Sequence, residues 1–203
     1  MKKYNEYITE AKKSTEHPFI QAAKNGNLST IKTYIKDGKV DINMKNEKEK
    51  RTALMYASME KFLLVVDVLL QAGVNPNLGD FDNRTALMMS ATMKNVDLLL
   101  RYNADVNIQA YKGDTALMEY LNYSWNGKQM ISMLEKFSDK GLDLDIKNSR
   151  GENFYEKLKN KQDDSRNVYD TEKYLMIEEY MNDKFPQYKE ERDFKRNVQK
   201  FNL

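Results

Sequence analysis

The sequence predicts an all-α fold, a solenoid of about five helix-turn-helix repeats. The tetrapeptide Thr-Ala-Leu-Met occurs three times and begins at Thr52, Thr85 and Thr115, which are 33 and then 30 residues apart. A second apolar segment and a polar closing phrase follow each copy. Repetition at this period is typical of stacked units that bury their apolar faces only against one another. It also predicts that function resides on an extended surface rather than in a cluster of catalytic side chains.

Each tetrapeptide is predicted to open the first helix of a repeat. Its threonine stands at the N-cap position, where the hydroxyl accepts a hydrogen bond from an otherwise unpaired backbone N–H. The leucine is expected to point into the stack, and the flexible methionine to fill gaps between neighbouring repeats. Small residues should let adjacent first helices approach closely; these are Ala57, Ser58, Ser90 and Ala91.

The second helix of each repeat is predicted from apolar residues at helical spacing, as in the run from Leu63 to Leu70. A residue able to adopt the left-handed conformation should end each of these helices. The residues expected there are Gly38, Gly73, Asn103 and Gly141.

These phrases resemble the ankyrin repeat family over roughly residues 17–160. The family pattern opens with Thr-Pro-Leu-His and closes with Gly-Ala-Asp-Val-Asn; its best counterpart here is Ala104-Asp-Val-Asn after Leu98-Leu-Leu. Alanine and methionine replace proline and histidine in all three tetrapeptides. The third unit is three residues short between its helices, and the fourth is about five too long. The resemblance implies an ankyrin-type α-solenoid with hairpin fingers between repeats and helical caps at both ends.

The predicted organisation has four parts. Residues 1–16 form an N-terminal capping helix, and residues 17–150 hold ankyrin repeats one to four. Residues 151–185 form a degenerate fifth repeat. Residues 186–203 are either a C-terminal helix, whose charge suits the outer face of a cap, or a tail without fixed structure.

Composition excludes several classes of function. Lys+Arg 33 against Asp+Glu 31 gives a net charge of +2, without the clustered basic excess that is typical of nucleic-acid binders. The longest apolar run is too short to span a bilayer. The chain has no cysteine and a single histidine, His17, which is expected to be structural at a helix start. We therefore predict no metal, no cofactor and no catalytic residue. Asp80 is expected to bind the backbone of its own hairpin.

The resemblance implies that a partner is held by the finger tips and by exposed first-helix positions, which line a concave groove. Phe81 and Tyr111 occupy the same position of successive fingers and should be neighbours; each ring either contacts a partner or packs against the next finger. Trp125, in the overlong fourth turn, either contacts a partner or covers that turn. The predicted partner-binding residues are Arg51, Met59, Glu60, Phe81, Asp82, Arg84, Met93, Tyr111, Lys112, Asp114, Tyr123 and Trp125.

The predicted function is a non-catalytic protein–protein interaction module that acts as a monomer and binds neither nucleic acid nor membrane. Two alternatives stay open at this point. One is a self-associating structural module whose last repeat exposes apolar surface. The other is an enzyme with a carboxylate site in the irregular fourth and fifth repeats, which predicts a deep pocket near Trp125. The excess of lysine over arginine, with many Asn, Ile and Tyr, indicates an AT-rich genome, and the phrase Thr52-Ala-Leu-Met-Tyr-Ala resembles bacterial ankyrin-like proteins. A cytoplasmic location is expected, although a secreted or periplasmic mature form fits the sequence as well.

Overall fold

The computed structural model of the chain describes residues 16–123, 125–163, 168–188 and 190, and is all-α in these ranges apart from one isolated bridge between Lys45 and Thr52. The chain divides into two compact units, Met1–Asp105 (unit 1) and Val106–Leu203 (unit 2). The predicted capping helix at 1–16 lies outside the described residues except for Glu16, and so does most of the predicted helix or tail at 186–203.

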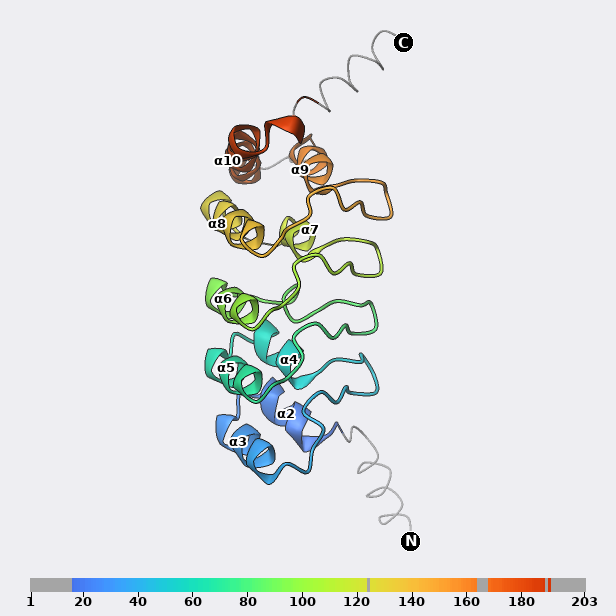
Figure 1. Cartoon of the computed structure of the whole chain (residues 1–203), viewed down its shortest axis with the longest axis vertical. Coiled ribbons are helices and arrows are strands. Elements are labelled where there is room, and N and C mark those ends of the chain that lie inside the picture. The colour runs from blue at the N-terminus through green and yellow to red at the C-terminus, as the bar shows by residue number, and fades with distance from the viewer. Residues whose placement is uncertain (1–15, 124, 164–167, 189, 191–203) are drawn as a thin grey trace. The chain divides into compact units, whose positions relative to one another are not determined.

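Unit 1 has two layers of helices from which loops project (Figure 1). Its helices are α2 (Pro18–Lys24), α3 (Leu28–Asp37), α4 (Ala53–Met59), α5 (Leu63–Gln71) and α6 (Met93–Arg101). The first helices α2 and α4 pack together, and α5 contacts both α3 and α6. Because the tetrapeptide residues Leu54, Met55, Leu87 and Met88 are all buried, the predicted inward role of the repeated phrase is confirmed in this unit.

The first helices of unit 1 begin at the predicted caps. His17 accepts a hydrogen bond at Nδ1 from the Phe19 N–H at 3.2 Å, so its role at this helix start is structural, as expected. The Thr52 hydroxyl accepts one from the Met55 N–H at 3.3 Å. These bonds satisfy backbone donors that the first turn of a helix leaves without a partner.

The prediction of a first helix after Thr85 is wrong. Residues 86–89 form only a turn, because this repeat is three residues shorter than its predecessor and the chain must leave the turn early. The Ser90 N–H already bonds to the Leu87 carbonyl at 3.1 Å, and the Ala91 N–H bonds across to the Ser58 carbonyl at 3.3 Å. Of the predicted small contacts, Ala57, Ser58 and Ser90 are buried, whereas Ala91 is exposed.

The second helices end as predicted. Gly38 follows α3 with φ of 61°, and Gly73 follows α5 with φ of 85°. Asn103 adopts φ of 60° after α6, as the substitute for glycine that tolerates this conformation best. Gly141 takes the same role in unit 2, with φ of 76°.

Unit 2 is built from α7 (Ala116–Tyr120), α8 (Gly127–Ser138), α9 (Phe154–Asp163) and α10 (Val168–Lys184). Thr115 precedes α7 but makes no capping hydrogen bond with its side chain, contrary to the expectation for this position. Asn153 takes the corresponding place before α9, where its carboxamide accepts from the Glu156 N–H at 2.9 Å. The helices α9 and α10 pack as a pair within the predicted fifth repeat, and α10 also contacts α8.

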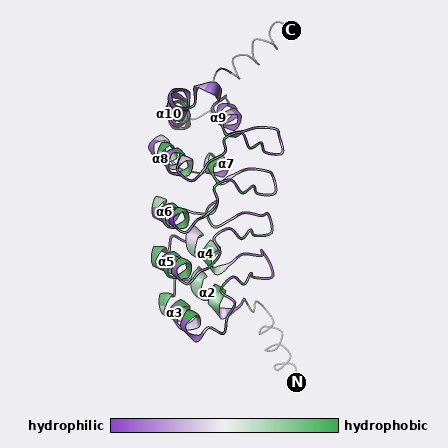
Figure 2. Cartoon of the chain, viewed as in Figure 1, coloured by the Kyte–Doolittle hydropathy of each residue, from purple (hydrophilic) through white to green (hydrophobic). Residues whose placement is uncertain are grey.

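The two units differ in hydropathy along their helices. Figure 2 shows hydrophobic colouring along α5 of unit 1, whereas α9 of unit 2 is largely hydrophilic. A terminal repeat needs a polar outer face because no further repeat covers it. The predicted division into five repeats and two caps remains a prediction.

Candidate partner-binding surface

Four loops of similar geometry project from the helices, two in each unit (Figure 1). In each loop the first residue donates its backbone N–H to the carbonyl of the last, at 2.9 to 3.0 Å. A residue with positive φ stands near the end of every loop and reverses the chain. We name the loops finger 1 (46–51), finger 2 (80–84), finger 3 (110–114) and finger 4 (148–152). The hairpin fingers predicted from the resemblance are therefore present.

Two fingers hold an exposed aromatic ring at the same position. Phe81 follows the first residue of finger 2 and is 80% exposed, and Tyr111 follows that of finger 3 and is 84% exposed. The alternative in which each ring packs against the next finger requires the ring to be covered. At these exposures neither ring is packed against the described residues. The two rings belong to different units, and each is therefore a feature of its own unit.

The backbone under each ring is braced by a neighbouring finger of the same unit. The Phe81 N–H donates to the Glu49 carbonyl of finger 1 at 3.0 Å. In unit 2 the Lys112 carbonyl of finger 3 accepts from the Ser149 N–H of finger 4 at 2.9 Å. Each aromatic side chain is thus presented to solvent from a backbone that is held in place.

The base of finger 2 is organised by Asp80, whose side chain is 2% exposed. One carboxylate oxygen accepts from the N–H groups of Asp82 at 3.0 Å and Arg84 at 2.9 Å. The other lies 3.1 Å from Arg84 Nη2 and 3.5 Å from Arg51 Nε. The predicted bonding of Asp80 to its own hairpin is confirmed. Because both arginines are engaged by Asp80, they brace the fingers and offer only part of their surface to a partner.

Finger 1 is tied to α4 by a cluster that sequence reasoning missed. The Tyr56 hydroxyl donates to the Glu49 carboxylate. Asn46 Nδ2 donates to this carboxylate at 3.3 Å and to the Tyr56 oxygen at 3.0 Å. It also donates to the Glu16 carboxylate at 3.1 Å, and Lys24 Nζ lies 3.2 Å from that carboxylate. The sequence signal for this cluster is Tyr56, the residue after the first tetrapeptide. The other two copies are followed by Met89 and Glu119.

The environment of this cluster shifts two pKa values. The bond from Tyr56 is the main cause that lowers the pKa of Glu49 below its ordinary value, because it stabilises the ionised carboxylate. Burial raises the pKa of Tyr56 well above its ordinary value, and the adjacent Glu49 adds to the rise. Tyr56 is 3% exposed, with Lys24 Nζ 4.6 Å from its ring centroid. The cluster holds finger 1 in place, and the side chains of Tyr56, Glu49 and Asn46 form hydrogen bonds with one another within it.

The remaining predicted residues of unit 1 lie at the ends of helices. Met59, the last residue of α4, is partly exposed, and Glu60 after it is exposed. Met93, the first residue of α6, is partly exposed. In finger 2, the Asp82 side chain is 53% exposed and lies 3.7 Å from Arg84 Nη2. The end of α4, the start of the second helix α6 and the tip of finger 2 thus supply the accessible part of the predicted set in unit 1.

Two predicted contact residues of unit 2 are buried. Asp114 is 8% exposed, because Lys157 Nζ lies 2.5 Å from Oδ2 and Asn148 Nδ2 donates to Oδ1 at 2.9 Å. Trp125 is also 8% exposed, with its ring centroid 5.8 Å from that of Tyr120, and this placement fits the covering role. Both residues are corrected to structural positions. Lys112 is exposed and Tyr123 is 40% exposed, so they stay in the candidate surface with Tyr111.

The described residues give no support to a carboxylate enzyme site near Trp125, because aromatic rings fill this neighbourhood. Among the residues that the structure describes, no group of three or more His, Asp or Glu side chains is placed to hold a metal ion. Across the same residues, no helix combines the length and apolar character needed to cross a membrane.

Stacked helix pairs, N-capped first helices and braced loops together define a helical repeat protein that presents side chains from a fixed frame. Residues 19–110, from α2 to the first residue of finger 3, match the family model described as ankyrin repeats, in three copies. The chain contains ankyrin repeats over these residues, and its described helices fit the predicted all-α ankyrin-type solenoid. Ankyrin repeats are generally protein–protein interaction modules without enzymatic activity. A bacterial origin stays a prediction.

Proposed function

We propose that this protein binds a partner protein through its finger tips and the adjoining ends of its first helices, without catalysis. The observation that carries the proposal is the exposure of Phe81 and Tyr111, each from a finger whose backbone is fixed by its neighbour. Large aromatic side chains are enriched among the residues that dominate binding energies at protein interfaces. Holding them in place before binding lowers the entropy that association must overcome.

Polar residues around each ring supply the specificity of the proposed contact. In unit 1, Phe81 is followed by the exposed Asp82, and the exposed Glu60 offers a separate charge after the end of α4. In unit 2, Tyr111 is followed by the exposed Lys112. An exposed charge at the rim of an interface acts mainly on partner choice and association rate, and contributes little to affinity. We therefore assign the affinity to the rings and the discrimination to the neighbouring charges.

The test is affinity capture from the native cell by the wild-type chain and by Phe81→Ala and Tyr111→Ala, singly and together. Each substitution is expected to weaken capture about thirtyfold or more, because loss of an interface anchor costs at least about 2 kcal/mol. The midpoint of thermal unfolding should stay nearly unchanged, since both rings are at least 80% exposed. Arg84→Glu is a poor variant for this purpose, because its new carboxylate would face Asp80.

The matched control is Leu64→Ala, which removes a 65% exposed apolar side chain from α5, a helix that belongs to neither candidate surface. A partner captured equally by the wild-type chain and this control, but lost by the Phe81 and Tyr111 variants, supports the proposal. Capture that survives the double replacement would assign binding to another surface.

Self-association is the second candidate, and one observation favours it. Leu175, Met176 and Tyr123 of unit 2 are 49%, 40% and 40% exposed. Two contacts connect them: the Tyr123 carbonyl accepts from Lys173 Nζ at 3.3 Å, and Met176 lies beside Gly127. Light scattering at high concentration separates the candidates. If the wild-type chain is a monomer, partner binding remains the sole proposal. If it is a dimer that Leu175→Glu dissociates, the result supports self-association.

A further inference from the structure

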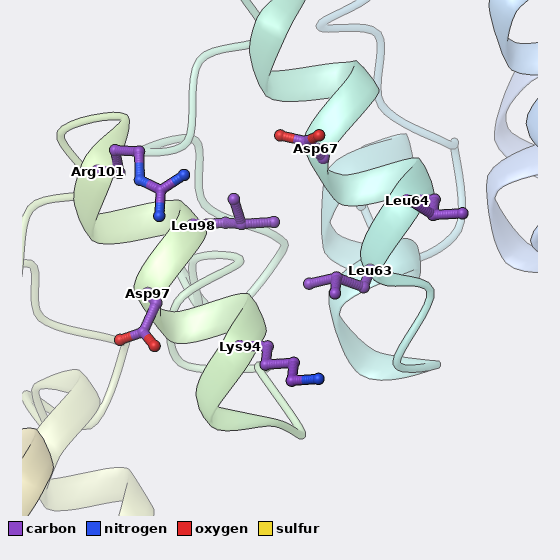
Figure 3. A pocket seen from close by; sticks show the side chains of 7 residues that line it. All are labelled: Leu63, Leu64, Asp67, Lys94, Asp97, Leu98 and Arg101. Atoms are coloured by element: carbon purple, nitrogen blue, oxygen red, sulfur yellow. The ribbon is translucent and has the colours of Figure 1, made fainter.

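Helix α6 is joined to the preceding repeat by an apolar contact and by a polar link. Figure 3 shows Leu63 of α5 and Leu98 of α6 facing each other, so these helices meet through aliphatic side chains. The polar link lies about one turn earlier on α6, where Asn95 Nδ2 donates to the Ser58 carbonyl of α4 at 3.2 Å. The Ala91 N–H donates to the same carbonyl at 3.3 Å. Two donors of the third repeat thus satisfy a carbonyl in the last turn of α4, which has no partner within its own helix.

The polar link lies where the third repeat has no first helix. Residues 86–89 form only a turn, so this repeat does not pack a helix on α4 as α4 packs on α2. The chain passes Ala91 instead and begins α6 at Met93. Met59 follows Ser58 directly, and Met93 precedes Asn95 by two residues. The link therefore joins the two segments that carry the methionines of the candidate surface.

Two buried polar atoms of this link have no hydrogen-bond partner among the described residues. They are the hydroxyl oxygen of Ser58 and Oδ1 of Asn95, and both residues are 0% exposed. Ser90 shows the usual arrangement, because its buried hydroxyl donates to the Ala86 carbonyl at 3.0 Å. An unpaired buried donor or acceptor is costly, and nearly all such groups in native proteins bond to protein or to ordered water.

The carboxamide of Asn95 cannot remove this mismatch by turning over. Exchanging its oxygen and nitrogen would place Oδ1 against the Ser58 carbonyl, so that two acceptors would face each other. Oδ1 therefore needs a donor, while the Ser58 hydroxyl needs an acceptor. A ligand that serves both must be small and able to donate and accept. It must also be uncharged, because a charge in a buried site needs a charged partner. Water meets all three conditions.

We propose that the link is a binding site for one buried water molecule, which accepts from the Ser58 hydroxyl and donates to Asn95 Oδ1. Buried waters of this kind bond to groups that would otherwise stay unpaired, and they are costly to remove. The water completes the connection between α4 and α6 and thereby positions Met59 and Met93. The site does not depend on the proposed function, and its failure would leave that function in place.

The test is NMR spectroscopy of the full chain with isotope-labelled asparagine, in the wild type, Ser58→Ala and Ser90→Ala. A dipolar cross peak is expected between water and the carboxamide protons of Asn95, which are assigned by their loss in Asn95→Ala. The cross peak should persist in Ser58→Ala, where no hydroxyl remains to exchange its proton with the solvent. Ser90→Ala is the matched control and should leave the cross peak unchanged, because it removes a buried hydroxyl that already has a partner.

The stability of Ser58→Ala provides a second measurement. The substitution should raise the equilibrium constant of unfolding about fivefold, because the bound water loses one hydrogen-bond partner. A lowered constant would show that the hydroxyl had no partner, since removing an unpaired buried group stabilises a fold. The positioning role is read from labelled methionine methyl groups: the Met59 resonance should shift in Asn95→Ala and stay in place in Ser90→Ala.

Three results would overturn the water site. The absence of the cross peak in the wild type would mean that the Ser58 hydroxyl bonds to the protein directly. A cross peak that disappears in Ser58→Ala would be a signal of the hydroxyl itself. A more stable Ser58→Ala chain would contradict the bridge. An unmoved Met59 resonance in Asn95→Ala would refute the positioning role alone.

Discussion

The two units fix their fingers with opposite arrangements of charge. In unit 1 a buried acid, Asp80, is held between two arginines at the ends of fingers 1 and 2. In unit 2 the corresponding end residues are acids, Asp114 and Glu152, and the cation comes from Lys157 of α9. The same backbone geometry is thus secured by the loops themselves in unit 1 and by a helix of the next repeat in unit 2. We therefore expect unit 2 to respond more strongly to the loss of one ionic partner.

The largest expected effect is that of Lys157→Ala. The side chains of Lys157 and Asp114 are 8% and 12% exposed, so the substitution leaves a buried carboxylate without its cation. Removing one partner from a buried pair costs about 3 kcal/mol or more. Urea unfolding followed by circular dichroism should show this loss in the transition of unit 2. The control is the double replacement Asp114→Leu with Lys157→Met, which should recover most of the stability because no charge remains unpaired.

If Lys157→Ala lowered the free energy of unfolding by less than 1 kcal/mol, the carboxylate of Asp114 would have to be solvated or held by Asn148 alone. The proposed difference between the units would then disappear.

Asp80→Ala tests the arrangement in unit 1, and a loss of about 2 kcal/mol is expected. The substitution removes the acceptor of the Asp82 and Arg84 N–H groups. The two arginines left behind are 16% and 33% exposed, so solvent can reach them better than it reaches the carboxylate in unit 2. Asp80→Asn should lose less, because the carboxamide still accepts from the backbone. Equal losses for Asn and Ala would mean that the ion pairs, rather than the backbone bonds, stabilise finger 2.

Sequence reasoning found the elements that depend on local chemistry. The caps at His17 and Thr52, the left-handed helix ends and the bonding of Asp80 follow from short-range rules that individual residues satisfy. The turn that replaces a helix after Thr85 was missed, although the three-residue deletion was visible. The tetrapeptide at Thr85 is the same as the one that opens a helix at Thr52, so the shorter length of the repeat decides the outcome.

Contacts between distant residues account for the other errors. Asp114 was assigned to the binding surface by its place in the finger, but Lys157, 43 positions away, covers it. Tyr56 joins Glu49 across a turn, and Glu16 joins the same cluster through Asn46. The periodicity of the sequence does not indicate such pairs, because their formation depends on how one repeat packs against the next.

A pH titration should distinguish finger 1 from the other fingers through Tyr56. The folded-state pKa of Glu49 lies below its ordinary value of 4.5, so this bond stabilises unit 1 above that pH and is lost as the pH falls through the folded-state value. The pKa of Tyr56 is raised, so its contribution is complete below the ordinary value of 10.0 and declines above it. Tyr56→Phe should cost about 1 kcal/mol at neutral pH.

The comparison that checks this assignment is the stability of both chains as a function of pH. Tyr56→Phe should lose less stability than the wild-type chain between pH 5 and 3, and less above pH 10. Parallel curves at both ends of the range would show that neither group depends on the other.

The smallest expected effect concerns finger 3, which lacks the side-chain anchor of the other fingers. Asn46, Asp80 and Asn148 each accept two backbone N–H groups of their own finger, whereas the corresponding residue of finger 3 is Ala110. Ala110→Asn should therefore stabilise unit 2 by about 0.5 kcal/mol through a new backbone bond. Ala110→Asp offers the same acceptor but adds a negative charge next to Asp114, so it should stabilise less or destabilise. If the two variants behaved alike, the charge on Asp114 would be fully neutralised by Lys157, and the gain would depend on the backbone bond alone.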